Sequence, residues 1–265
     1  MGLDLYARIE PYLDFEEEIY SLHKEFLKFI MVNDLDNIID IGCGQGYFLN
    51  NLSINKKKAF GIDLSVEQIK ICEEKGLNAK AIALENVEEK FDCATAIFDV
   101  LNYIPKIELE KFILQVNKVL NPNAYFIFDV NTYFGFDEVA QGTINIDIED
   151  KFIAIDAFFE NDKLQTNITL FEKEKSGKYR KEQDKIVQEY HKKEYLEKIL
   201  KKSGFEIVEI KEFFLHTDES ADKLIFICKK FFFFFFFFFF FFFFFFFFFP
   251  PPLFISFNFK HQKKL

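Results

Sequence analysis

Short apolar runs alternate with amphipathic segments over the first half of the chain. Apolar residues recur at helical spacing from 16 to 32, which predicts a helix with one buried face. The apolar runs that follow have the length and composition of strands buried on both faces, and lie at 37–41, 58–63, 79–83, 93–98 and 124–130. Further helices are expected between them, at 47–52, 66–76 and 107–120. This alternation predicts an α/β fold with a Rossmann-like, doubly wound and mainly parallel sheet.

The pattern changes after residue 140. Polar and apolar residues then alternate with period two, and Asn161-Asp162 and Ser176-Gly177 provide turns between the runs. We therefore expect an antiparallel insertion of three or four strands at about 140–190, with one face exposed to water. A helix at 192–203 and strands at 205–214 and 222–230 should return the chain to the first sheet.

An unbroken run of Phe at 231–249, followed by three Pro, separates residues 1–230 from the end of the chain. Natural membrane spans mix residue types so that helices can pack, which disfavours this run as an anchor. We interpret 231–265 as a low-complexity tail, an artefact or without function, and 1–230 as one domain with its insertion. No apolar stretch within 1–230 approaches the about 20 residues of a membrane span, and the acidic N-terminus does not resemble a signal peptide.

Charge and cysteine usage narrow the possible partners. Residues 1–230 carry 30 basic and 43 acidic groups, a net charge of −13, which disfavours a nucleic acid as the main partner. The four Cys form no C-x-x-C pair, so the sequence indicates neither a metal site nor a disulfide framework. The expected location is the reducing cytoplasm.

The residues with the clearest chemistry follow the first predicted strand, in the segment DIGCGQG at 40–46. Glycines let the backbone turn tightly and approach a ligand, and the helix that follows offers free N–H groups. A dinucleotide fingerprint requires G-x-G-x-x-G, but Tyr47 stands where its third Gly belongs. Asp40 would repel a diphosphate and would attract a cationic amino group. Asp63, at the end of the second strand, can accept hydrogen bonds from both hydroxyls of a ribose.

Three segments, DIGCGQG (40–46), GIDLS (61–65) and FDVLNYI (98–104), resemble the class I S-adenosylmethionine-dependent methyltransferases. The resemblance covers about 35–130 well and is recognisable to Lys230. It implies that S-adenosylmethionine is the cofactor, with the ribose on Asp63, the adenine beside Leu64, and the methionine part and methyl-transfer cleft beside Phe98 and Asp99. The implied positions in the glycine turn are Asp40, Gly42, Cys43, Gly44 and Gly46, with Cys43 a small buried residue rather than a nucleophile.

The insertion resembles that of a subgroup in which added strands cover the cleft for a small-molecule acceptor. The implied acceptor-binding residues are Tyr6, Tyr103 and His191, although Tyr103 could equally belong to the core and His191 to the surface. No catalytic residue is assigned, because a sulfonium is already activated and positioning can suffice. Methylation of RNA or protein, a nucleotide-sugar or NAD enzyme, and a non-catalytic binding module remain alternatives.

Two segments depart from the resemblance. The stretch at 83–86 has no Asp where many relatives bind the adenine amino group. The stretch at 220–223 has no Arg, although relatives with the covering insertion often carry one there.

Overall fold

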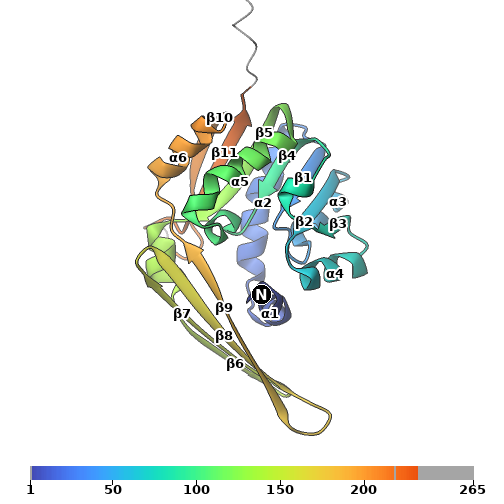
Figure 1. Cartoon of the computed structure of the whole chain (residues 1–265), viewed down its shortest axis with the longest axis vertical. Coiled ribbons are helices and arrows are strands. Elements are labelled where there is room, and N and C mark those ends of the chain that lie inside the picture. Colours follow the sequence, from blue (N-terminus) through green and yellow to red (C-terminus); the bar gives the residue numbers. More distant parts are fainter. Residues whose placement is uncertain (1, 218, 232–265) are drawn as a thin grey trace, which may run out of the picture. The chain divides into compact units, whose positions relative to one another are not determined.

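The computed structural model describes residues 2–217 and 219–231 (Figure 1). The helices are α1 (Gly2–Ile9), α2 (Glu16–Val32), α3 (Tyr47–Ile54), α4 (Val66–Glu74), α5 (Lys106–Val119) and α6 (Lys193–Lys202), with short helical turns η1 (Glu10–Tyr12), η2 (Leu84–Asn86), η3 (Val100–Tyr103) and η4 (Gly135–Ala140). The strands are β1 (Asn37–Ile41), β2 (Lys58–Asp63), β3 (Ala79–Ala81), β4 (Phe91–Ala96), β5 (Leu120–Asn131), β6 (Gly142–Ile148), β7 (Lys151–Glu160), β8 (Lys163–Lys173), β9 (Tyr179–Glu189), β10 (Phe205–Phe213) and β11 (Lys223–Lys230). Apart from Phe231, the predicted tail lies outside the described residues.

The main sheet has the strand order β10-β11-β5-β4-β1-β2-β3. Strands β1 to β5 pair in parallel, whereas β11 lies antiparallel to both β5 and β10. The order reverses at β1, from which the chain winds first towards β3 and then towards β5. The predicted doubly wound, Rossmann-like sheet is therefore confirmed.

Alternate strand residues enter two separate cores, one on each face of this sheet. Ile39 and Phe128 pack with α5 and α6, whereas their neighbours Ile38 and Ile127 pack with α2 and α3. Successive side chains of a strand point to opposite faces. Because both faces of the sheet are covered, these strands are apolar on both faces and appear in the sequence as continuous apolar runs.

The predicted insertion is a separate antiparallel sheet with the order β6-β7-β8-β9. Its inner face packs against α1, where Leu5 and Ile9 meet Ile153 and Ile168 (Figure 1). Helix α1 was not predicted from the sequence, and it is only eight residues long. Such a short helix is unstable alone and owes its existence to the surfaces that it covers.

Strand β4 ends at Ala96, two residues before the predicted end at Phe98. Phe98 and Asp99 instead have left-handed backbone conformations, with φ of 63° and 52°. Such conformations are strained for residues other than glycine and occur where the surroundings hold them in place.

Among the described residues, no helix is both long enough and apolar enough to cross a membrane.

Candidate active site

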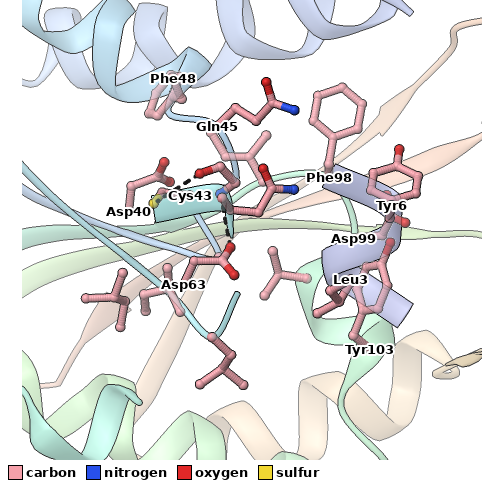
Figure 2. A pocket seen from close by; sticks show the side chains of 18 of the residues that line it. Leu3, Tyr6, Asp40, Cys43, Gln45, Phe48, Asp63, Phe98, Asp99 and Tyr103 are labelled. Atoms are coloured by element: carbon pink, nitrogen blue, oxygen red, sulfur yellow. Dashed lines mark hydrogen bonds between the residues drawn. The ribbon is translucent and has the colours of Figure 1, made fainter. Parts of the chain in front are cut away.

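A cavity of about 1140 Å³ opens at the carboxyl ends of β1, β2 and β4. Helix α1, turn η1 and helix α2 contribute to its wall, and β9 of the insertion contributes Lys185, Ile186 and Val187. Figure 2 shows Asp40, Cys43 and Asp63 on one side of it and Tyr6, Tyr103, Phe98 and Asp99 on the other. The predicted residues that line it are Tyr6, Asp40, Gly42, Cys43, Gly44, Asp63, Leu64, Phe98, Asp99 and Tyr103.

Gly46 and His191 are the two predicted residues that do not line the cavity. Gly46 faces the side chains of Leu77 and Cys72 behind the turn. His191 is buried, and its Nε2 lies 3.1 Å from the carbonyl oxygen of Leu101 and 3.2 Å from that of Ile104. This imidazole therefore ties the end of the insertion to η3, and the structure does not bring it to the acceptor side of the cavity.

The glycine turn begins with Gly42, whose N–H donates to the carbonyl of Ile62 at 2.8 Å. The φ of Gly42 is +71°, and a Cβ there would lie 2.8 Å from a methyl carbon of Val100. A side chain is therefore excluded both by the backbone conformation and by the residue that packs on it.

Replacing Gly42 by Ala should cost more stability than the same change at Gly76. The φ of Gly76 is +70°, but a Cβ there would meet nothing within 4 Å. Both variants therefore lose about 1 kcal/mol of stability because alanine is placed at a positive φ. At Gly42 the clash with the stiff Val100 side chain should add a further loss of about 1–3 kcal/mol. Urea unfolding of both variants measures the difference. Equal losses would show that the contact with Val100 relaxes without cost.

Asp40 is only 3% exposed, at the end of β1. The hydroxyl of Thr95 donates to its Oδ1 at 2.7 Å, and no described residue donates a hydrogen bond to its Oδ2. Burial, with a smaller contribution from the Asp63 carboxylate, raises the pKa of Asp40 to about 7. A buried carboxyl with one oxygen unpaired is suited to a cationic ligand group, which would stabilise its charged form.

Asp63 is held in place by backbone groups at the end of β2. Its Oδ2 accepts from the N–H of Gly44 at 3.1 Å, and its Oδ1 accepts from the N–H of Ser65 at 2.8 Å. Burial raises the pKa of Asp63, although these N–H groups oppose the shift. Each oxygen keeps acceptor capacity towards the cavity. Leu64, beside it, is 59% exposed and offers an apolar surface there.

Asp129 on β5 holds Phe98 and Asp99 in their strained conformations. Its two oxygens accept from the N–H of Phe98 at 2.7 Å and from the N–H of Asp99 at 3.0 Å. Lys223 of β11 lies 3.0 Å from Asp129 and also pairs with Asp99, while Gln188 of β9 donates to Asp99 at 2.6 Å. Two sheets thus converge on the side chain of Asp99.

Helix α1 is bonded to both halves of the cavity wall. On the side of the glycine turn, Ser65 donates to Asp4 at 2.6 Å and Gln45 donates to the carbonyl of Ala7 at 3.1 Å. On the insertion side, Arg8 pairs with Glu182 at 2.7 Å and with Glu172 at 2.9 Å. The helix closes the cavity over the glycine turn.

His23 and Glu10 line the cavity as well, and the sequence analysis had not placed them there. Burial lowers the pKa of His23 to about 4, so its imidazole is neutral, 3.3 Å from the amide of Asn51. Burial raises the pKa of Glu10, which accepts from Gln45 at 3.0 Å. His23 follows Leu22 on the buried face of α2, and a polar residue on an apolar stripe is the pattern that could have indicated it.

A family model described as a methyltransferase domain matches residues 14–210. The chain belongs to the class I S-adenosylmethionine-dependent methyltransferases. This methyltransferase is 23% identical over 208 residues to a putative methyltransferase of Geobacillus sp. (strain WCH70), covering 73% of this chain and 84% of the relative.

Two solved structures illustrate the shared fold. An S-adenosylmethionine-dependent methyltransferase from Clostridium acetobutylicum ATCC 824 superposes with a TM-score of 0.72 at 23% identity, covering 86% of this chain and 99% of that one. The amino pentose methyltransferase CalS10 from Micromonospora echinaspora, solved with S-adenosylmethionine bound, gives a TM-score of 0.62 at 15% identity, covering 83% and 98%. At these identities the likeness concerns the fold.

The donor set of this methyltransferase fits the family's cofactor. The unpaired oxygen of Asp40 suits an ammonium group, the carboxylate of Asp63 suits a pair of hydroxyls, and the turn between them has no side chain in the way at Gly42 and Gly44. Among the residues described, no cluster of His, Cys, Asp and Glu is arranged to hold a metal ion.

Proposed function

We propose that this methyltransferase transfers a methyl group from S-adenosylmethionine to a small-molecule acceptor beneath β9 of the insertion. The observation that carries the proposal is that one cavity joins the glycine turn and both carboxylates to a chamber walled by α1, Phe98 and β9. A covered chamber of this size suits a small molecule better than a polymer. The likeness to CalS10, an amino pentose methyltransferase, also favours a small acceptor.

The residues of the chain bind and orient rather than react. The bound cofactor supplies a methyl group on a sulfonium, which is already activated for transfer. Asp40 would hold the ammonium of its methionine part, Asp63 its ribose hydroxyls, and Leu64 would cover its adenine. Tyr6, Phe98 and Tyr103 line the other end, where they would hold an acceptor atom in line with the methyl group.

The charge of the wall argues against a nucleic-acid acceptor. Among the described residues, the lysines that line the cavity are Lys111 and Lys185, whereas its carboxylates are Glu10, Asp14, Glu16, Asp40, Asp63, Glu85, Asp99 and Glu108. A phosphate backbone would be repelled here. We also infer a cytoplasmic location, which the four free and buried cysteines favour.

Calorimetry with S-adenosylmethionine tests the cofactor, and transfer of a labelled methyl group tests the reaction. Saturable binding is expected, followed by labelling of the small-molecule fraction of a cell extract. The absence of binding at millimolar ligand would overturn the proposal. Label in precipitated RNA or protein, with none in the small-molecule fraction, would overturn the acceptor class.

Affinity for S-adenosylmethionine should rise with pH across neutrality. Burial raises the pKa of Asp40 to about 7 in the free protein, and the ligand's ammonium binds the deprotonated form. Below that pKa the carboxyl must first lose a proton, so affinity should increase by about eightfold between pH 6 and 7.5. Calorimetry in buffers of different ionisation enthalpy measures the proton released. In an Asp40→Asn variant binding should be weaker and this rise should disappear; an unchanged rise would assign it to another group.

A further inference from the structure

We propose that the acceptor is an amine, bound as its ammonium ion between Tyr6, Tyr103 and Asp99. This inference rests on the proposed methyl transfer and names the chemistry of its acceptor. The three residues lie together on the side of the cavity opposite Asp40 and Asp63, where an acceptor would meet the methyl group (Figure 2).

Two aromatic rings reach this end of the cavity from different elements. Tyr6 comes from α1 and Tyr103 from η3, and both pack against the inner face of the insertion. Burial raises the pKa of both phenols, so neither is ionised at neutral pH. Within the described ranges neither hydroxyl has a hydrogen-bond partner, although both side chains line the cavity. Ring faces attract cations, and the free phenol oxygens can accept from an N–H donor.

The charges of Asp99, Asp129 and Lys223, which form one ion-pair group, do not sum to zero. Asp99 and Asp129 share one ammonium, that of Lys223, which leaves one negative charge in a buried group of three. Burial alone would lower the pKa of Lys223, but both carboxylates raise it, so the lysine stays charged. Asp129 and Lys223 do not line the cavity, whereas Asp99 does. A cation placed against Asp99 would balance the group from the cavity side.

Glu10 adds a second carboxylate to the wall of the cavity, on the side of the glycine turn, where Gln45 donates to it at 3.0 Å. Its charge interacts with both phenols, as does that of Asp99. Burial raises the pKa of Glu10, and the amides of Gln68 and Gln45, which donate to its Oε2, oppose the shift. Two aromatic rings and the carboxylate of Asp99, supported by the negative charge of Glu10 elsewhere in the wall, favour a cation over a neutral alcohol of the same shape.

The transfer balances with no further reactant. The bound ammonium first loses one proton to bulk water, to which the cavity is open where its lining residues Asp14 and Glu16 are exposed. The lone pair of the resulting amine forms the new N–C bond, and the pair of the broken S–C bond stays on sulfur. The product is a methylated ammonium, so the charge against Asp99 is restored after transfer.

Binding of cyclohexylamine and cyclohexanol to the protein saturated with S-adenosylhomocysteine tests this inference by ligand-observed NMR. The two probes share their ring and differ in the cationic group. The amine should bind about tenfold or more tightly than the alcohol. Equal affinities, or no detectable binding of the amine while S-adenosylhomocysteine binds, would overturn the inference and leave the proposed methyl transfer standing. Failure of S-adenosylhomocysteine to bind would overturn both.

Substitutions locate the subsite. Tyr6→Leu and Tyr103→Leu should each weaken amine binding by about fivefold, with alcohol binding and cofactor affinity nearly unchanged. Asp99→Asn should weaken amine binding by about tenfold. Tyr179→Leu is the control, because Tyr179 is exposed and lies outside the cavity. Thermal unfolding identifies any variant that fails to fold. If Asp99→Asn unfolds because Lys223 loses one of its two carboxylate partners, the test rests on Tyr6→Leu and Tyr103→Leu. Retention of the amine preference in both variants would contradict the inference.

Discussion

An Asp63→Ala variant is expected to bind S-adenosylmethionine at least about a hundredfold more weakly than the unaltered protein. A carboxylate that accepts two hydroxyl hydrogen bonds contributes about 1.5–3 kcal/mol for each. The substitution also leaves the N–H groups of Gly44 and Ser65 without their acceptor, so the glycine turn loses the bond that fixes it to β2. Calorimetry at constant pH measures the loss.

Asp92→Ala is the matched control for this experiment. Asp92 lies near the beginning of β4, bonds to Asn121 at 2.8 Å and does not line the cavity. Its replacement should leave cofactor affinity unchanged. If the affinity of Asp63→Ala for S-adenosylmethionine stays within about threefold of that of the unaltered protein, Asp63 does not bind the ribose.

Lys223→Met should lower the free energy of unfolding by about 3–5 kcal/mol at pH 8. The change removes the only lysine that contacts Asp99 and Asp129 among the described residues and leaves two carboxylates buried against each other. Burial already raises the pKa of Asp129 against the opposing pull of Lys223, and without the lysine it should rise further. A carboxyl whose pKa is higher in the folded state than in the unfolded state lowers the free energy of unfolding as pH rises from the unfolded-state pKa to the folded-state pKa. The loss of stability caused by Lys223→Met should therefore be smaller at pH 5 than at pH 8.

Urea unfolding at pH 8 and pH 5 measures this dependence. The double variant Lys223→Met/Asp129→Asn should recover part of the loss, because it removes one of the unpaired charges. Lys229→Met, on the same strand but partly exposed, should cost less than about 1 kcal/mol. A deficit that does not change with pH would assign the loss to packing instead of charge.

Features encoded within short segments could be predicted from the sequence. The strands of the main sheet could be predicted because both of their faces are covered and apolar. The glycine turn could be predicted because its characteristic residues lie in one segment of seven, 40–46. Asp63, which accepts a hydrogen bond from the glycine turn, is the last residue of the next strand, β2. The carboxyl ends of the parallel strands β1 and β2 lie at the same edge of the sheet. Local pattern and the rule for parallel sheets were sufficient for these positions.

Features that depend on distant contacts were not predicted. The backbone at Phe98 turns left-handed because Asp129, 31 positions later, accepts its N–H. Lys223 meets Asp99 across 124 positions, and no local pattern records that pairing. His191 has a polar side chain at the end of a strand, which fits a site as well as a structural tie; only the carbonyl oxygens of Leu101 and Ile104 distinguish the two.

Helix α1 ties the glycine turn and the insertion to one another across the wall of the cavity. Ser65 and Gln45 hold it on one side, and Glu172 and Glu182 hold it on the other. In the proposed function α1 would border both the cofactor and the acceptor. A displacement of this one short helix would therefore alter access to both ligands at once, and loosening its bonds should change the release of both products together.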